Sequence, residues 1–257
     1  MSTLALINNK GGVGKTTTAV HLAEGLNRQG EKVLLVDLDA QASASLSLGC
    51  ERGELEPSVA SLLYQDMDPD EVIRKAPGAD LDLVTGSEKL QNADIRLAGE
   101  LGRERILADI LEDVESHYDV IILDCPPSLA LLPVNAIVAS DWFIVPVEPH
   151  YLALEGVGSM LDTVQSIREE IGEAAELLGV VVTRADFRAK ATEQAIEMLR
   201  EEHGDTMFDT VVRGNVRVSE ATSFGTTVFE HAPSSTGAEA YRSLTREVVS
   251  RLNGKNQ

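Results

Sequence analysis

The chain has 257 residues, of which 43% are hydrophobic and 25% are charged. This composition is that of a globular protein with a sizeable core, and it excludes a disordered, collagen-like or coiled-coil chain. The 42 acidic residues outnumber the 22 basic ones, which gives a formal net charge of −20.

Apolar, β-rich runs alternate with helix-length amphipathic segments, a pattern typical of a parallel α/β sheet. In chain order the predicted strands are 4–7, 33–38, 81–84, 120–123, 142–147 and 178–183. The predicted crossover helices are 16–29, 103–115 and 154–171. No repeat or linker divides the chain, so residues 1–257 are predicted to form a single domain with a doubly wound, mostly parallel, helix-covered sheet. Residues 50–80 are the expected excursion from it.

A glycine-rich loop joins the first predicted strand to the first predicted helix. It reads Asn9-Lys10-Gly11-Gly12-Val13-Gly14-Lys15-Thr16-Thr17. In this context backbone N–H groups and the helix N-terminus converge on phosphate, Lys15 adds a charge and the Thr16 hydroxyl faces Mg²⁺. The loop departs from GxxxxGK[ST], because Asn9 stands where the first glycine belongs and Lys10 follows it. A nucleotide phosphate site is predicted, and a turn that merely joins strand to helix is the alternative.

Acidic residues follow two predicted strands. Asp37 and Asp39 come at the end of 33–38, and Asp124 follows 120–123. Because the carboxyl ends of parallel strands meet at one edge of a sheet, we expect Asp37 and Asp39 to turn toward the phosphates. Asp124 is expected to hold Mg²⁺ through water. Capping of the strand ends is the structural alternative for these carboxylates.

The motifs KGGVGKTTT, DLDAQ and DCPPS, in this order and spacing, resemble the deviant Walker A ATPases of the ParA/MinD group, and most closely the ParA/Soj-type partition ATPases. The resemblance spans nearly the whole chain, because further segments also match: 131–136, 145–148, 153–156, 183–186 and 215–221. It implies a P-loop NTPase fold, ATP and Mg²⁺ as cofactors, and ATP hydrolysis to ADP and phosphate.

The resemblance also implies roles for individual residues. Lys10 reaches across an ATP-sandwich dimer, Asp39 positions the attacking water, and residues 125–128 form a switch that reports the nucleotide state. The implied catalytic set is Lys10, Lys15, Asp39 and Asp124. The implied nucleotide-binding set is Gly11, Gly12, Val13, Gly14, Lys15, Thr16, Thr17 and, near the adenine pocket, Thr183. Thr16 and Asp124 are the implied Mg²⁺ residues, and a lysine from the partner makes charge stabilisation conditional on dimerisation.

The implied function is plasmid or chromosome partition in the cytoplasm, at the nucleoid. An ATP-bound homodimer would bind DNA nonspecifically, and a ParB-like activator would release it by stimulating hydrolysis. Arg188 and Arg217 match positions that carry DNA affinity. Their candidate neighbours are Lys190, Arg213, Arg242 and Arg246. Residues 184–217 hold six basic and seven acidic side chains, so ordinary surface ion pairs are the alternative for both arginines.

A MinD-like or other positioning ATPase, acting on a membrane or a protein scaffold, is the main alternative function. A membrane form would need a basic amphipathic anchor at the C-terminus, whereas the apolar stripe within 240–252 is expected to pack on the domain. We therefore expect no membrane partner and no C-terminal anchor, and no helix-turn-helix module before Leu4. Two isolated cysteines disfavour an iron–sulfur carrier, and the five histidines are expected to be surface or packing residues.

The acidic excess is concentrated in residues 51–119, which carry 18 acidic and 7 basic side chains. The whole chain has only 7 lysines. Because an acid-rich, lysine-poor surface keeps a protein soluble in concentrated salt, a halophilic source is one hypothesis. A mesophilic protein with a solvated acidic face is the other.

Overall fold

A computed structural model describes residues 1–128, 130–151 and 153–255. Its centre is an eight-stranded sheet with the order β3-β4-β2-β5-β1-β6-β7-β8. The strands are β1 (Ser2–Leu6), β2 (Val33–Asp37), β3 (Arg74–Lys75), β4 (Asp82–Val84), β5 (Val120–Asp124), β6 (Trp142–Val147), β7 (Glu176–Ala185) and β8 (Met207–Arg213). All neighbours pair in parallel except β3, which runs antiparallel to β4 at one edge. The predicted fold class, a single α/β domain, is confirmed.

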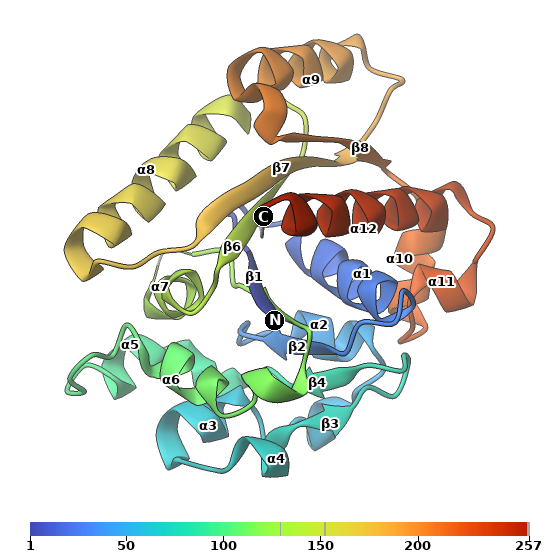
Figure 1. The fold of residues 1–257 in the computed structure, drawn as a ribbon. Coiled ribbons are helices and arrows are strands. Elements are labelled where there is room, and N and C mark those ends of the chain that lie inside the picture. The colour runs from blue at the N-terminus through green and yellow to red at the C-terminus, as the bar shows by residue number, and fades with distance from the viewer. Residues whose placement is uncertain (129, 152, 256–257) are drawn as a thin grey trace.

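Helices cover both faces of this sheet (Figure 1). On one face lie α1 (Lys15–Asn27), α2 (Ser43–Ser47), α10 (Val216–Ser223), α11 (Val228–His231) and α12 (Thr236–Lys255). On the other lie α3 (Val59–Gln65), α4 (Pro69–Val72), α5 (Ala93–Arg96), α6 (Ile106–Glu112), α7 (Leu131–Val138), α8 (Ala153–Ile171) and α9 (Lys190–His203). Short 3-10 turns occupy Arg52–Glu54, Glu88–Asn92, Glu115–His117 and Gly204–Thr206.

The two helical layers pack against side chains that the same strands present on opposite faces of the sheet. In β1, Leu4 and Leu6 belong to the core under α1 and α12, whereas Ala5 belongs to the core on the other face. This division follows from the two-residue period of an extended chain. Both faces of a central parallel strand are therefore apolar, which explains why the strands read as continuous hydrophobic runs.

Most predicted elements are confirmed within a few residues. The helix expected at 103–115 is shorter, as α6 begins at Ile106, and the expected excursion 50–80 contains α3, α4 and β3. The C-terminal stripe packs on the domain as predicted, because Tyr241, Leu244 and Val248 of α12 are buried. Within the described ranges no helix is both long enough and apolar enough to cross a membrane. Strand β8 is not among the strands that the sequence pattern predicts.

Candidate functional site

The glycine-rich loop leaves β1 and ends on the first turn of α1, as predicted. Gly12 and Gly14 have φ angles of 78° and 82°, in the left-handed region that favours glycine. Gly14 is the N-cap of α1 and supplies no side-chain cap. The first N–H groups of α1 therefore keep their hydrogen-bonding capacity for an anion, and the helix dipole favours negative charge there.

Lys15 and Asp124 form the buried centre of the site. Lys15 is 5% exposed and donates from Nζ to the main-chain oxygen of Lys10 at 3.1 Å. Burial lowers the pKa of Lys15, while the charge of Asp124 opposes that shift. Burial and the neighbouring Asp37 raise the pKa of Asp124 well above its usual range, although Thr16 and Lys15 act in the opposite direction. The site thus holds buried charge that a bound phosphate and cation would compensate.

Asp124 and Thr16 have the chemistry of a Mg²⁺ site. Asp124 is fully buried, and although the Thr16 hydroxyl lies near enough to lower its pKa, neither carboxylate oxygen accepts a hydrogen bond of normal geometry from the residues described. An orphaned buried carboxylate needs a partner such as a cation or its water. No cluster of three or more His, Cys, Asp or Glu residues capable of holding a metal occurs within the described chain. Oxygens of a bound nucleotide and of water would therefore have to complete the shell around Thr16 and Asp124.

The two carboxylates after β2 differ in their surroundings, which corrects the expectation that both turn toward the phosphates. Asp37 is fully buried, and its Oδ2 accepts from the N–H and the hydroxyl of Ser45 at 2.9 and 2.7 Å. Burial raises its pKa to about 6. Asp39 is only half-buried, and its Oδ1 accepts the N–H of Gln41 at 2.9 Å. Asp37 therefore fixes the loop into α2, because its lone pairs are used locally, and Asp39 is the carboxylate left near Lys15.

His150 lies beside Lys10, a contact that sequence reasoning missed because 140 positions separate them. Lys10 is exposed, and its Nζ contacts Nε2 of His150, which follows β6. An ammonium and an imidazole can share this contact only when the ring nitrogen is the acceptor. Tyr151, the next residue, is 75% exposed. No spacing signal links position 150 to the glycine loop, so only tertiary structure brings it there.

A cavity of about 1080 Å³ opens beside the loop. It is lined by Gly14 and Thr17 together with the ends of β7 and β8 and the start of α10. Thr183, the residue expected near an adenine pocket, lines this cavity; its hydroxyl donates to Val13 O at 2.6 Å and lies 3.1 Å from Val147 O. Thr183 thus anchors the loop to the neighbouring strands. Sequence reasoning did not assign Arg184 or Phe187 to this lining.

The candidate DNA-contact arginines are paired with acids. Arg188, 90% exposed, binds Asp186 through Nη2 at 2.6 Å, and this arginine lowers the pKa of Asp186 to about 2. Arg217 binds Glu220 at 2.7 Å. Arg242 and Arg246 both contact Glu239. The alternative interpretation of Arg188 and Arg217, as surface ion pairs, describes their state in this structure.

Comparisons with known proteins extend over nearly the whole chain. A family model described as an AAA domain matches residues 1–177. The sporulation initiation inhibitor protein Soj of Bacillus subtilis is 40% identical over 246 residues, covering 96% of this chain and 97% of that protein. The chromosome partitioning protein ParA of Caulobacter vibrioides is 38% identical over 250 residues, 96% of this chain and 94% of that protein. A solved structure of cobyrinic acid a,c-diamide synthase from Mycobacterium smegmatis with bound ADP and magnesium is 30% identical, with a TM-score of 0.83, and covers 95% of this chain and 92% of that one.

Proposed function

Since the chain belongs to the ParA/Soj family of P-loop partition ATPases, we propose that it is a Mg²⁺-dependent ATPase that works as a dimerising switch in plasmid or chromosome segregation. The ATP-bound homodimer binds DNA nonspecifically at the nucleoid, and a ParB-like activator ends this state by stimulating hydrolysis. The observation that carries the proposal is the burial of both Lys15 and Asp124 beside the glycine loop, close enough for the charge of Asp124 to act on Lys15. A buried ammonium and a buried carboxylate beside free helix N–H groups are suited to a nucleoside triphosphate with its cation.

Each residue of the site has a part in this cycle. Lys15 and the N-terminus of α1 would bind the phosphates, while Thr16 and, through water, Asp124 would hold Mg²⁺. When bound, Mg²⁺ supplies charge neutralisation at the phosphate oxygens. Asp39 orients the attacking water, since Oδ2 of its half-buried carboxylate accepts no hydrogen bond from the described residues. In this assignment Asp124 and Asp39, the two carboxylates that act on Lys15, both serve ATP hydrolysis.

Lys10 makes hydrolysis depend on dimerisation. Its side chain is exposed and rests against His150, outside the buried centre of its own site. Release from this contact would free the ammonium to reach a γ-phosphate held by a second copy. A charge delivered by the partner stabilises the transition state only in the dimer, which is the logic of an arginine finger. Hydrolysis then limits the lifetime of the dimer.

A second candidate function is a positioning ATPase that acts on a protein scaffold. The pairing of Arg188 with Asp186 and of Arg217 with Glu220 favours it, because paired guanidinium groups and a net charge of −20 weaken attraction to DNA phosphates. The nucleotide cycle is the same in both cases. The two functions differ only in the surface to which the ATP-bound form binds.

DNA binding in defined nucleotide states separates these functions. The protein would be titrated against DNA with ADP, with ATP and with a nonhydrolysable ATP analogue across a salt series, and its size would be measured in parallel. Binding only by the triphosphate dimer, with a steep salt dependence, is the expected result. The Lys15→Ala variant is the control that should neither bind nucleotide nor dimerise. A dimer that ignores DNA at every salt concentration would overturn the partition function in favour of the scaffold function.

A further inference from the structure

A groove of about 860 Å³ lies between α3, α5 and α6, and no residue of the glycine loop lines it. Its floor is apolar, with Leu62, Leu63 and Leu97 buried and Ile106 and Ile110 half-buried. In Figure 1 the three helices lie together at the lower left, below α7. Neither the nucleotide site nor the candidate DNA surface uses this part of the molecule.

The rim of the groove carries uncompensated negative charge. Four exposed carboxylates line it, those of Asp66, Glu100, Asp109 and Asp113. None of them forms an ion pair with any residue that the structure describes. The one cation of the lining, Arg96, stacks over the ring of Tyr64 at 4.9 Å. The groove therefore presents an apolar floor inside an acidic rim.

Two large apolar side chains are exposed in the chain segment that supplies part of the lining. Ile95 of α5 is 76% exposed, and Leu101, in the segment between α5 and α6, is fully exposed. Single exposed apolar residues are ordinary on protein surfaces. Here, however, both belong to the segment that also supplies Arg96, Leu97 and Glu100 to the lining.

The walls of the groove are hydrogen-bonded to α7, the helix that follows the loop after β5. Oδ1 of Asp94, on α5, accepts the N–H of Leu131 at 3.0 Å. The buried Asn135 of α7 accepts the N–H of Leu107, on α6, at 3.1 Å and donates to Arg103 O at 2.8 Å. These hydrogen bonds join α5 and the start of α6 to α7, the helix that follows β5 and Asp124 in the chain.

We propose that this groove is the docking site for a basic amphipathic segment of a partner protein, and that its occupation acts through α7 on the loop after β5. The inference rests on the proposed function, in which a partner stimulates hydrolysis, and it assigns the segment to that activator. Lysine and arginine side chains complement the rim, and an apolar helix face fits the floor. A nucleic acid is disfavoured as occupant, because its phosphates would meet the same carboxylates.

Binding of a defined peptide tests the docking site. The probe is a fluorescent amphipathic peptide with leucines on one helical face and lysines on the other, added to the full-length protein with ADP. Replacing Asp109→Asn and Asp113→Asn together should weaken binding about fivefold or more. The matched control is Glu197→Gln with Glu201→Gln on α9, which removes the same charge at the same spacing from exposed positions. This control should leave the dissociation constant within about twofold of wild type.

The link to α7 needs a separate readout. Peptide binding should change hydrogen exchange at the amides of 131–135 in the wild-type protein. In the Asp94→Ala variant, which lacks the acceptor of the Leu131 N–H, the peptide should bind with a smaller change in exchange.

Three results would be decisive against these ideas. Equal weakening by the groove pair and by the α9 pair would mean nonspecific attraction to an acidic protein, and the docking site would be lost. Saturating peptide with unchanged exchange in α7 would overturn the link to the loop. A chain that hydrolyses no ATP with any activator would overturn the proposed function instead, because neither peptide measurement requires hydrolysis.

Discussion

Three carboxylates, those of Asp37, Asp39 and Asp124, share one end of the sheet with the ammonium group of Lys15. Asp37 and Asp124 are register partners on adjacent strands, so their side chains leave the sheet on the same side. Burial raises the pKa of both and lowers the pKa of Lys15. Perturbed pKa values of this kind gather at functional sites, which agrees with the position of the cluster beside the glycine loop.

The Asp39→Ala substitution should separate nucleotide binding from hydrolysis. Because Asp39 is proposed to orient the attacking water, its loss should slow hydrolysis about a hundredfold or more while ATP binding and dimerisation persist. Single-turnover phosphate release and size measurement with ATP are the checks. The Lys15→Ala variant, which should lose nucleotide binding altogether, is the comparison. Normal hydrolysis by the Asp39→Ala protein would remove Asp39 from the reaction.

His21 should make stability depend on pH. It is buried in α1, where Nε2 accepts the N–H of Val228 at 3.0 Å and Nδ1 donates to Thr17 O at 2.7 Å. Burial lowers its pKa to about 4, below the ordinary value of 6.5. The unfolded state therefore binds more protons between these values, and stability falls by up to about 3 kcal/mol as pH drops from about 6.5 to 4.

The His21→Leu variant isolates this contribution. Carboxylates whose pKa is raised, such as Asp37, have the opposite pH dependence, but they are present in both proteins. Urea unfolding should be measured at several pH values. The free energy of unfolding of wild type minus that of the variant should decrease as pH falls from about 6.5 to 4. A constant difference across this range would show that His21 does not titrate as its burial requires.

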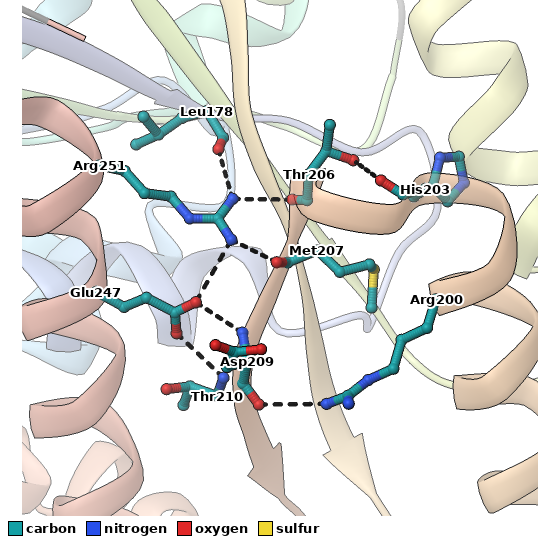
Figure 2. A network of polar contacts seen from close by, with 9 residues as sticks. All are labelled: Leu178, Arg200, His203, Thr206, Met207, Asp209, Thr210, Glu247 and Arg251. Atoms are coloured by element: carbon teal, nitrogen blue, oxygen red, sulfur yellow. Dashed lines mark hydrogen bonds and ion pairs between the residues drawn. The ribbon is translucent and has the colours of Figure 1, made fainter. Parts of the chain in front are cut away.

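At the scale of elements, α12 secures an irregular edge strand. The register of β7 with β8 shifts between the pairs Val180–Met207 and Val182–Val211, so the stretch of β8 between them cannot pair regularly. Glu247 of α12 accepts the freed N–H groups of Asp209 and Thr210 at 2.6 and 3.1 Å (Figure 2). Arg251 donates to the main-chain oxygens of Leu178, Thr206 and Met207. Side chains of the last helix thus replace bonds that the ladder lacks.

The Arg251→Ala substitution should destabilise the fold through this network. Its guanidinium is mostly buried and also stacks over Phe208 at 4.1 Å. Loss of several charge-assisted hydrogen bonds should lower the free energy of unfolding by about 2–3 kcal/mol in urea titrations. The control is Arg246→Ala on the same helix, which loses an exposed ion pair with Glu239 and should lower the free energy of unfolding much less. Equal losses in the two variants would show that the network adds nothing.

At the scale of the whole molecule, the net charge of −20 opposes the compact state. Unpaired carboxylates such as those of the α3–α5–α6 groove add to this repulsion. Added NaCl screens it, so the urea midpoint should rise between about 0.1 and 2 M NaCl. Continued stabilisation and loss of structure at low salt would favour a halophilic source. A rise that levels off below about 1 M, where the Debye length is already about 3 Å, would favour a mesophilic protein with a solvated acidic face, and no rise at all would contradict the repulsion argument.

The balance of charge on α10 should set the affinity for DNA. If Arg217 contacts phosphates, Arg217→Glu should weaken DNA binding by the ATP dimer. The slope of log K against log salt concentration should also become less steep by about 1 or more, because at least one phosphate contact is lost. Conversely, Glu220→Gln should strengthen binding, because it frees the guanidinium from its ion pair. Dimer formation with ATP should be unchanged in both. DNA binding that ignores both substitutions would exclude α10 from the interface.

Local pattern in the sequence alone was enough to determine the fold class, the central strands and the glycine-rich loop between β1 and α1. The central strands could be located because a strand that is buried on both faces is apolar throughout. The loop read correctly because glycines with left-handed φ angles and the GKT sequence lie within a few covalent bonds of one another. The ParA/Soj family was recognisable for the same reason, since each of its motifs is a short contiguous segment.

Tertiary structure alone decided the contacts between distant or differently buried side chains. Asp37 accepts a hydrogen bond from Ser45, whereas Asp39 lies near Lys15, although both acids stand at the end of the same strand. His150 contacts Lys10 only in the folded chain. Strand β8 pairs with a shifted register, which no local periodicity predicts. The physical reason is that a residue's neighbours in space depend on the register and packing of whole elements, whereas sequence spacing reports only neighbours along the chain.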